Sequence, residues 1–205
     1  MPSRIRQNSN QSLSKRNPKL SNCHIVTLSN CYIVTFFLLV LYDKTSDMEK
    51  IAIFPGSFDP FTLGHESIIK RALPLFDQII IMIGYNSNKK PYYPLAKRKE
   101  WIRRVFENEP KIRVGKFDGL TVDYCKRVHA QYILRGLRTS SDFEYERAIA
   151  QINKKMHPEV ETVFLLTTPE TTAISSTIVR DILRHKGDAS LFLPSCIDIS
   201  EFYEG

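Results

Sequence analysis

The run Ile79-Ile80-Ile81-Met82-Ile83 places five apolar residues in succession, and four of them are β-branched. A strand with one solvated face alternates apolar and polar residues, whereas an unbroken apolar run this short indicates a strand that is buried on both faces. Strands of that kind belong to parallel sheets that carry helices on each side. We therefore expect a strand at 78–84 inside a layered α/β fold.

Strand and helix patterns alternate on either side of that run. Trp101, Ile102, Val105 and Phe106, for example, recur at helical spacing. The expected strands are 50–54, 78–84, 111–114, 132–134 and 162–166, and the expected helices are 64–75, 95–108, 120–129, 142–156, 175–185 and 195–203. This order predicts a doubly wound, Rossmann-like parallel sheet with right-handed crossovers, in a single domain spanning residues 48–205.

The first 47 residues differ in character from the rest. They are rich in Ser, Asn, Arg and Lys up to residue 30, which is typical of disorder. The apolar run at 33–41 is too short to span a bilayer as a helix, and no Ala-x-Ala-like cleavage site follows it. We interpret residues 1–47 as an N-terminal extension, either disordered or a product of start-site choice, and expect the native chain to begin at Met48.

Charge and cysteine content narrow the class of partner. Residues 1–47 hold six Lys/Arg and two Asp, so they carry more than half of the net charge of +7. The mild excess of positive charge in residues 48–205 suits small anionic ligands better than a nucleic-acid duplex. The four cysteines form neither a C-x-x-C pair nor a zinc-ligand spacing. We expect a cytoplasmic protein with reduced thiols, no metal site of its own, and no nucleic-acid or membrane partner.

Residues 54–65, Phe-Pro-Gly-Ser-Phe-Asp-Pro-Phe-Thr-Leu-Gly-His, join the first expected strand to the first expected helix. A tight Pro/Gly turn lets backbone N–H groups approach anionic oxygens, and a helix N-terminus adds partial positive charge. Gly64 and His65 stand at that helix start. The segment therefore predicts a site for nucleotide phosphate.

Two later segments predict other sides of the same pocket. Residues 174–180, Ile-Ser-Ser-Thr-Ile-Val-Arg, open a helix with three hydroxyls and an arginine, and Arg135-Gly136-Leu137-Arg138 follows the expected strand 132–134. In doubly wound sheets, ligands bind beyond the carboxyl ends of the strands, where the strand order reverses. We expect all three segments to meet there.

The polar residues of these segments are donors and cations rather than a nucleophile with its base. They are His65, Lys89, Arg135, Arg138, Ser175, Ser176, Thr177 and Arg180. Neither a Gly-x-Ser-x-Gly elbow nor Walker A spacing is present. Such a set suits nucleotidyl or phosphoryl transfer, which depends on positioning and on stabilising charge.

The motifs also carry a family resemblance. Thr62-Leu63-Gly64-His65 and residues 174–180 resemble the paired T-x-G-H and I-S-S-T-x-x-R motifs of the nucleotidyltransferase superfamily. With the blocks at 54–60, 89–91, 134–138 and 142–146, residues 48–205 closely resemble the bacterial phosphopantetheine adenylyltransferase family. The resemblance implies that ATP and 4′-phosphopantetheine give dephospho-coenzyme A and pyrophosphate, with Mg²⁺ bound with ATP. It also implies a homohexamer, a dimer of trimers, with feedback inhibition by coenzyme A.

The resemblance assigns roles to individual residues. It implies catalytic roles for His65, Lys89 and Arg135. The implied ATP site comprises Ser57, Phe58, His65, Gly136, Leu137, Arg138, Glu146, Thr171, Thr172, Ala173, Ile174, Ser175, Ser176 and Thr177. The implied 4′-phosphopantetheine site comprises Ser57, Lys89, Thr121 and Arg135. Where this chain has Thr171, the family commonly has an aromatic residue.

Simpler roles remain open for several of these residues. Lys89 and its neighbour Lys90 would, taken alone, be a solvated pair. Asp142 and Glu144 are expected to be acids of a helix N-terminus, and Ser175 can cap a helix and bind phosphate together. For Arg135 and Arg138 we expect ligand contact rather than a purely structural ion pair. Trp101 is expected to be a packing residue.

Competing functions are also open. The acceptor could be nicotinate mononucleotide, flavin mononucleotide or a polyol phosphate on the same scaffold. A fragment of a class I aminoacyl-tRNA synthetase would need a lysine-rich loop and an anticodon-binding region, for which no space remains. A non-catalytic nucleotide- or RNA-binding module is disfavoured because the chain keeps its charged site residues and lacks an aromatic stacking stripe.

Overall fold

The computed structural model describes residues 48–84, 91–198 and 200. The predictions for residues 1–47, and those for Lys89 and Lys90, lie outside the described residues. The elements below belong to the compact unit formed by residues 49–205. None of the helices in the described residues is long and apolar enough to cross a membrane.

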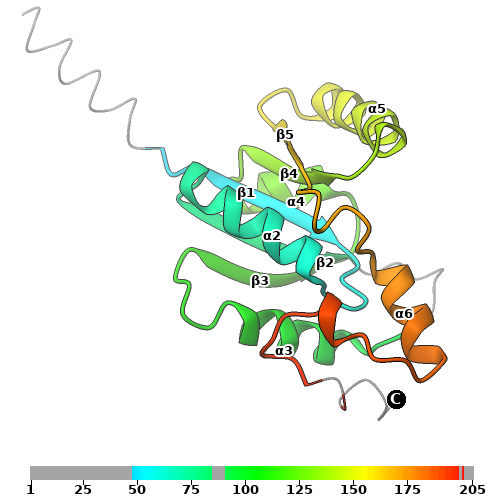
Figure 1. Ribbon diagram of the computed structural model, residues 1–205. Coiled ribbons are helices and arrows are strands. Elements are labelled where there is room, and N and C mark those ends of the chain that lie inside the picture. The colour runs from blue at the N-terminus through cyan, green and yellow to red at the C-terminus, as the bar shows by residue number, and fades with distance from the viewer. Residues whose placement is uncertain (1–47, 85–90, 199, 201–205) are drawn as a thin grey trace, which may run out of the picture. The chain divides into compact units, whose positions relative to one another are not determined.

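Five parallel strands form one sheet in the order β3-β2-β1-β4-β5 (Figure 1). The elements in chain order are β1 (Ile51–Gly56), α2 (Leu63–Ala72), the 3₁₀ turn η1 (Leu73–Leu75), β2 (Gln78–Gly84), α3 (Leu95–Val105), β3 (Ile112–Phe117), α4 (Thr121–Val128), β4 (Tyr132–Leu137), α5 (Ser140–Met156), β5 (Glu161–Leu166), α6 (Ser176–Arg184) and η2 (Ser190–Phe192). This order confirms the predicted α/β class and the doubly wound topology.

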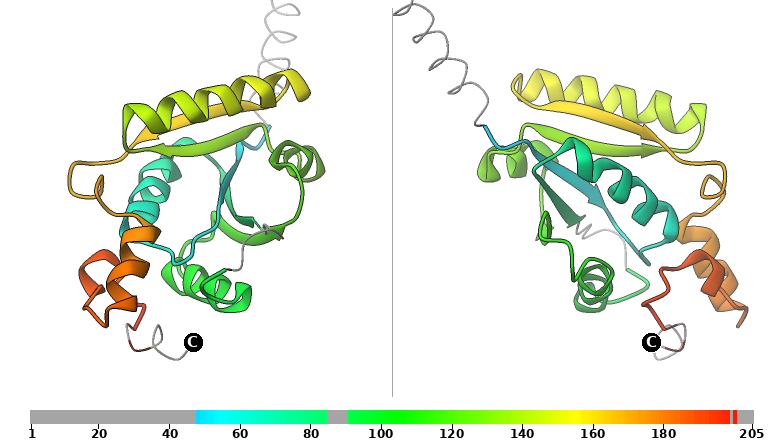
Figure 2. Two further views of the ribbon diagram at one scale, coloured as in Figure 1. Left: turned by 90° about the vertical axis from the view of Figure 1, so that its right-hand side faces the viewer. Right: turned by 60° about the vertical axis from the view of Figure 1, so that its left-hand side comes forward.

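Strand β2 separates two apolar layers, as its sequence predicts. Ile79, Ile81 and Ile83 pack in a cluster with α2 and α3. Ile80 and Met82 pack in a second cluster with α4, on the other face. In the left view of Figure 2, α2 and α4 lie on opposite sides of the sheet.

A third apolar cluster fixes the position of α6. Trp101 of α3 is fully buried against Val179 and Leu183 of α6 and against the segment 189–197. This confirms Trp101 as a packing residue. As a result, α6 is held beyond the end of β1 (Figure 2).

Some boundaries differ from the sequence predictions. The expected strand 111–114 continues to Phe117, because β3 is an edge strand that tolerates the exposed Lys116. The expected strand 132–134 continues to Leu137. The expected helix 195–203 is wrong where it is described, because Ser195 and Cys196 lie in a turn that the hydrogen bond from Ile197 N–H to Pro194 O closes.

The sheet opens between β1 and β4. Strand β1 pairs with β2 along all of its length, but it pairs with β4 only at Ala52 and Ile53. Beyond these residues β4 remains paired with β5 up to Leu137. The two central strands therefore separate toward their carboxyl ends, at the point where the strand order reverses and ligands bind in such sheets.

Candidate active site

A pocket of about 1000 Å³ lies where β1 and β4 separate. Arg135 of β4 reaches across the opening, and its Nη1 donates to the carbonyl oxygen of Pro55 at 2.8 Å. The pocket walls come from the turn after β1, the start of α2, the end of β4, α5 and the start of α6. The three segments that the sequence singles out therefore meet, as predicted.

The turn between β1 and α2 is held in an unusual backbone conformation. Phe58 has a φ of 47°, which is uncommon for a residue with a side chain. Its ring is buried and packs against those of Phe54, Phe61 and His65. Packing of this kind over-determines the local conformation and so can hold a strained residue in place. The exposed residue of this turn is Ser57, which lines the pocket.

His65 is the third residue of α2, and its ring is fixed on two sides. The Thr62 backbone N–H donates to His65 Nδ1 at 3.1 Å, so the neutral ring carries its proton on Nε2. The rings of Phe58 and Phe61 lie 5.1 and 5.4 Å from it, centroid to centroid. Burial, followed by the charges of Arg138 and Arg135, lowers the pKa of His65 to about 4. At neutral pH the imidazole is therefore an uncharged donor at the start of a helix.

Glycine at position 64 lets α2 approach the segment before α6. A Cβ on Gly64 would lie 3.4 Å from the carbonyl oxygen of Ile174. A side chain larger than the methyl group of alanine would press the two segments apart. The close approach brings two helix N-termini to one pocket, and each offers free N–H groups and partial positive charge to an anion.

The start of α6 is tied to the turn after β1. Ser175 is the N-cap, and its hydroxyl accepts from the Ile178 N–H at 3.2 Å, which confirms the capping role. The Ser176 hydroxyl donates to Pro60 O at 2.9 Å, and Arg180 Nη1 donates to Asp59 O at 2.5 Å. These bonds hold the hydroxyl-rich segment beside His65.

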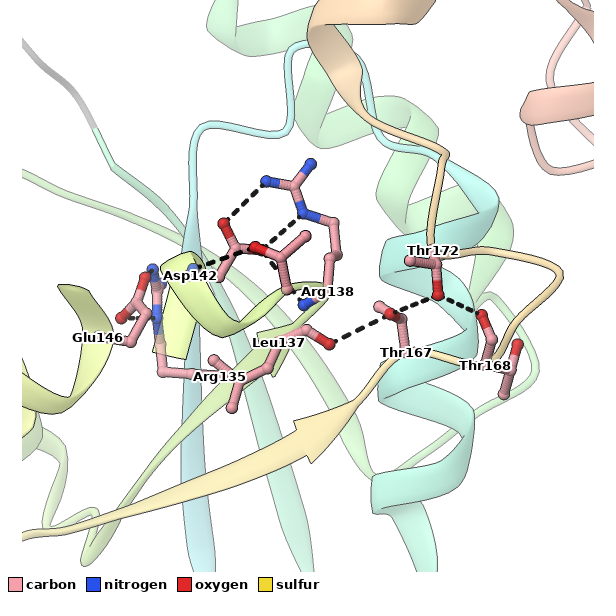
Figure 3. Close-up of polar contacts among 9 residues, drawn as sticks. Arg135, Leu137, Arg138, Asp142, Glu146, Thr167, Thr168 and Thr172 are labelled. Carbon is pink, nitrogen blue, oxygen red and sulfur yellow. Dashed lines mark hydrogen bonds and ion pairs between the residues drawn. The ribbon is translucent and has the colours of Figure 1, made fainter. Parts of the chain in front are cut away.

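Two arginines at the end of β4 pair with carboxylates of α5 (Figure 3). Arg135 Nε donates to Glu146 at 2.8 Å, and its Nη2 bonds to the other carboxylate oxygen. Arg138 Nε donates to Asp142 at 3.0 Å. Both arginines therefore line the pocket and also form ion pairs, which the sequence did not reveal, and their contact with a ligand stays a prediction. Because Asp142 and Glu146 are one helical turn apart, a single helix face reaches both cations.

Of the two acids that the sequence places at the N-terminus of α5, Asp142 and Glu144, only Asp142 lies in the first turn. Its N–H donates to the N-cap Thr139 hydroxyl at 3.2 Å. Burial raises the pKa of the Asp142 carboxyl, but hydrogen bonds and charge from Arg138 outweigh it and lower the pKa overall. Glu144 instead forms a surface ion pair, in which Arg147 Nη2 donates to Glu144 Oε2 at 2.7 Å.

Threonines after β5 form a local hydrogen-bond network, of which Thr167 alone lines the pocket among the described residues. The Thr167 hydroxyl donates to Leu137 O at 3.1 Å and lies 3.1 Å from the Thr172 hydroxyl (Figure 3). The Thr172 hydroxyl donates to Thr168 O at 2.9 Å, and Thr171 bonds to Thr168 as well. The hydroxyls of these threonines therefore stabilise the loop between β5 and α6.

The pocket gathers most of the residues that the resemblance names. Those that line it are Ser57, Phe58, His65, Arg135, Gly136, Arg138, Glu146, Ile174, Ser175, Ser176 and Thr177. Leu137, Thr171, Thr172, Ala173 and Thr121 are not among its lining residues, and Lys89 lies outside the described residues. The ligand contacts of all these residues stay predictions.

Sequence reasoning missed several residues of the pocket wall. Asp59, Tyr92, Arg98 and Arg184 line it without having been proposed for it. A signal existed for Arg98, because it interrupts the helical stripe of apolar residues that begins at Leu95. Among the described residues, no group of three or more His, Cys, Asp or Glu side chains could hold a metal ion.

Comparisons with known proteins agree with this chemistry. The family described as cytidylyltransferase-like matches residues 53–182. The phosphopantetheine adenylyltransferase of Flavobacterium johnsoniae is 53% identical over 150 residues, which cover 73% of this chain and 98% of that protein. The enzyme of the same name from Bacteroides thetaiotaomicron is 51% identical over 149 residues, covering 73% of this chain and 98% of its own.

A solved structure extends the likeness to the fold. The bifunctional NMN adenylyltransferase/ADP ribose pyrophosphatase of Francisella tularensis, complexed with AMP and a manganese ion, superposes with a TM-score of 0.55 and 18% identity. The match covers 75% of this chain and 46% of that one. At this identity, the likeness concerns the fold alone.

Proposed function

The chain belongs to the phosphopantetheine adenylyltransferase family, and on that premise we propose that it transfers the adenylyl group of ATP to 4′-phosphopantetheine. The products are dephospho-coenzyme A and pyrophosphate. The observation that carries the proposal is the meeting of His65, Arg135, Arg138 and the α6 N-terminus around one pocket. All of these groups stabilise negative charge, and none is a nucleophile.

In the proposed reaction, a phosphate oxygen of 4′-phosphopantetheine attacks the α-phosphorus of ATP in line, and pyrophosphate leaves. His65 donates its Nε2–H to the oxygen on which charge develops, and its fixed ring costs no reorganisation in the transition state. Arg135 and Arg138 stabilise the reacting phosphates, while the N-termini of α2 and α6 bind the triphosphate. Ser57 contacts both the nucleotide and the acceptor phosphate.

The proposed metal is Mg²⁺ that arrives with ATP. Magnesium in such sites keeps several waters and is bound largely by substrate phosphates, with one or two carboxylates at most. Asp59, Asp142 and Glu146 are the acids of the pocket wall. Asp142 and Glu146 each already hold an arginine, and the Asp59 carboxylate already accepts from two backbone N–H groups. When bound, the ion would neutralise charge on the leaving pyrophosphate.

The test is pyrophosphate release with ATP and Mg²⁺ and each of three acceptors: 4′-phosphopantetheine, nicotinate mononucleotide and flavin mononucleotide. We expect release with 4′-phosphopantetheine alone, and none when EDTA replaces Mg²⁺. A chain beginning at Met48 should be as active as the full chain, because the pocket residues lie between Phe54 and Arg184. Release with only another acceptor would keep the nucleotidyltransferase chemistry and overturn the substrate.

The proposed assembly is a homohexamer, a dimer of trimers, with feedback inhibition by coenzyme A and a cytoplasmic location. A feature of α5 supports self-association. Tyr145, Ile149, Ile152 and Met156 follow one another at helical spacing and are all exposed. An apolar stripe of this kind on a surface marks an interaction site.

A further inference from the structure

The end of β1 and the turn after it have four carbonyl groups held by side chains from three other elements. Pro55 O accepts from Arg135 of β4 at 2.8 Å, Ser57 O from Arg98 of α3 at 2.5 Å, Asp59 O from Arg180 of α6 at 2.5 Å, and Pro60 O from Ser176 of α6 at 2.9 Å. Three of these four donors belong to the motifs that the sequence assigns to the pocket. Arg98 does not.

Arg98 is a charged residue at an apolar position. Its side chain is 2% exposed and lies on the α3 stripe that includes Leu95 and the buried Ile102. Its Nε has no hydrogen-bond partner within the described residues. Burial lowers the pKa of the Arg98 guanidinium, against the nearby charge of Asp59, which raises it. A leucine would avoid this desolvation cost, so the role of Arg98 must come from what its guanidinium holds.

The bond from Arg98 orients the peptide group between Ser57 and Phe58. That peptide precedes the positive φ of 47° at Phe58, and the carbonyl direction and this φ are set together. The next residue is fixed as well, because the Asp59 carboxylate accepts from the N–H groups of Tyr92 and Tyr93 at 2.7 and 2.9 Å. Ser57 is thus an exposed residue between rigid neighbours.

We propose that Arg98 is a positioning residue for the adenylyl transfer: by holding the Ser57 carbonyl, it fixes the direction in which the Ser57 hydroxyl faces the pocket. The inference rests on the proposed function. Misplacing a reacting group by about 1 Å can cost on the order of 100-fold in rate, so a buried residue that sets one hydroxyl can govern turnover.

The first comparison is Arg98→Met against Arg103→Met. Methionine retains an apolar stem but loses the donor, and Arg103 is an exposed arginine on the same helix. We expect Arg98→Met to lower kcat roughly 30- to 100-fold while the KM for ATP changes less than about threefold. Arg103→Met should match the wild type. Arg98→Lys keeps a cationic donor for the same carbonyl and should recover kcat to within about tenfold of the wild type.

A double-mutant cycle with Ser57→Ala separates positioning from a general structural effect. If Arg98 acts through the Ser57 hydroxyl, Arg98→Met should lower kcat less than about threefold in the Ser57→Ala background. Where Arg98→Met is too unstable to assay, Arg98→Lys in both backgrounds gives the same comparison. Equal losses in the two backgrounds would overturn the positioning role.

The outcomes distinguish this inference from the proposed function. An active wild-type chain whose Arg98→Met variant equals Arg103→Met would overturn the role of Arg98 alone. A wild-type chain that releases no pyrophosphate with 4′-phosphopantetheine would contradict the proposed function, and with it this role. Loss of kcat that depends on the Ser57 hydroxyl would support both.

Discussion

The tautomer of a single histidine decides how the pocket can act at neutral pH. Because the Thr62 N–H occupies Nδ1 of His65, the ring has one proton to offer, on Nε2. Burial and two neighbouring arginines keep the ring uncharged. A phosphate that binds as we propose would therefore meet a neutral, oriented donor, and the positive charge would come from Arg135 and Arg138.

His65→Ala should lower kcat by about 10²- to 10³-fold, because the variant loses a fixed donor to the transition state. The KM for ATP should change much less, since the arginines and both helix N-termini remain. The measurement is steady-state pyrophosphate release, with His185→Ala as the control, because His185 is 78% exposed and does not line the pocket. A loss of tenfold or less would mean that His65 is not the main stabilising group.

The lowered pKa of His65 also predicts how stability depends on pH. Between about 6.5 and about 4, the unfolded chain binds a proton at this residue that the folded chain excludes. The free energy of unfolding should therefore fall as pH drops through this window, by roughly 2 kcal/mol at pH 5. Denaturant unfolding of the wild type and of His65→Gln at pH 7 and pH 5, at fixed protein concentration, measures this.

The glutamine variant removes the titration and is the control for all other groups. The free energy of unfolding of the wild type, relative to that of His65→Gln, should fall by roughly 2 kcal/mol between pH 7 and pH 5. A difference that stays constant with pH would show that the ring is not held neutral by the fold.

At the scale of the element, Ser175 at the N-terminus of α6 has two roles, one structural and one proposed in ligand binding. Ser175 caps the helix, and it lines the pocket where the triphosphate is proposed to bind. Ser175→Ala should cost about 1 kcal/mol of stability, because a helix N–H loses its acceptor. Ser175→Asp keeps the cap, so its stability should stay near that of the wild type.

The aspartate variant should nevertheless bind ATP on the order of tenfold more weakly, because its carboxylate repels the phosphates by roughly 1.4 kcal/mol. Ser175→Thr, which keeps the hydroxyl, serves as the control for both readouts. Thermal unfolding measures the capping role of Ser175, and the KM for ATP measures its role in binding the triphosphate. Unchanged ATP affinity in Ser175→Asp would restrict Ser175 to capping.

The elements also show what sequence patterns can and cannot specify. Strand β2 was predictable because its residues Ile79–Ile83 are all buried in the two apolar layers. The end of β4 was not, because Arg135-Gly136 resembles a turn, whereas the pairing of Arg135 with Phe164 and of Leu137 with Leu166 extends the strand. That pairing depends on β5, which lies far along the chain. The motif residues were found, but the ion pairs that hold two of them were not.

At the scale of the whole molecule, the tertiary contacts are the part that the sequence left open. Arg98 lies 41 residues from the carbonyl it holds, and only the folded α3 brings the two together. In the same way, the opening between β1 and β4 follows from pairing and not from any local pattern. Local patterns predict elements and motifs, while the support of the pocket is set by packing between elements.

The exposed stripe on α5 yields a prediction for the assembly. Ile152 is 56% exposed in the single chain, so Ile152→Glu should cost the fold of one subunit little. If the stripe is buried between copies of the chain, the same change places an unpaired charge in an apolar contact and should dissociate the assembly. Light scattering coupled to size-exclusion chromatography should then give a smaller mass than for the wild type, with an unchanged circular dichroism spectrum.

Leu75→Glu is the matched control, because Leu75 is 50% exposed and lies in η1, outside the stripe. It should leave the mass of the assembly unchanged, since the new charge would remain in water. If Leu75→Glu dissociates the assembly and Ile152→Glu does not, the contact lies on the face of η1 rather than on α5. A wild-type chain that is monomeric at micromolar concentration would contradict the proposed homohexamer itself, and the stripe would then have to serve a different partner.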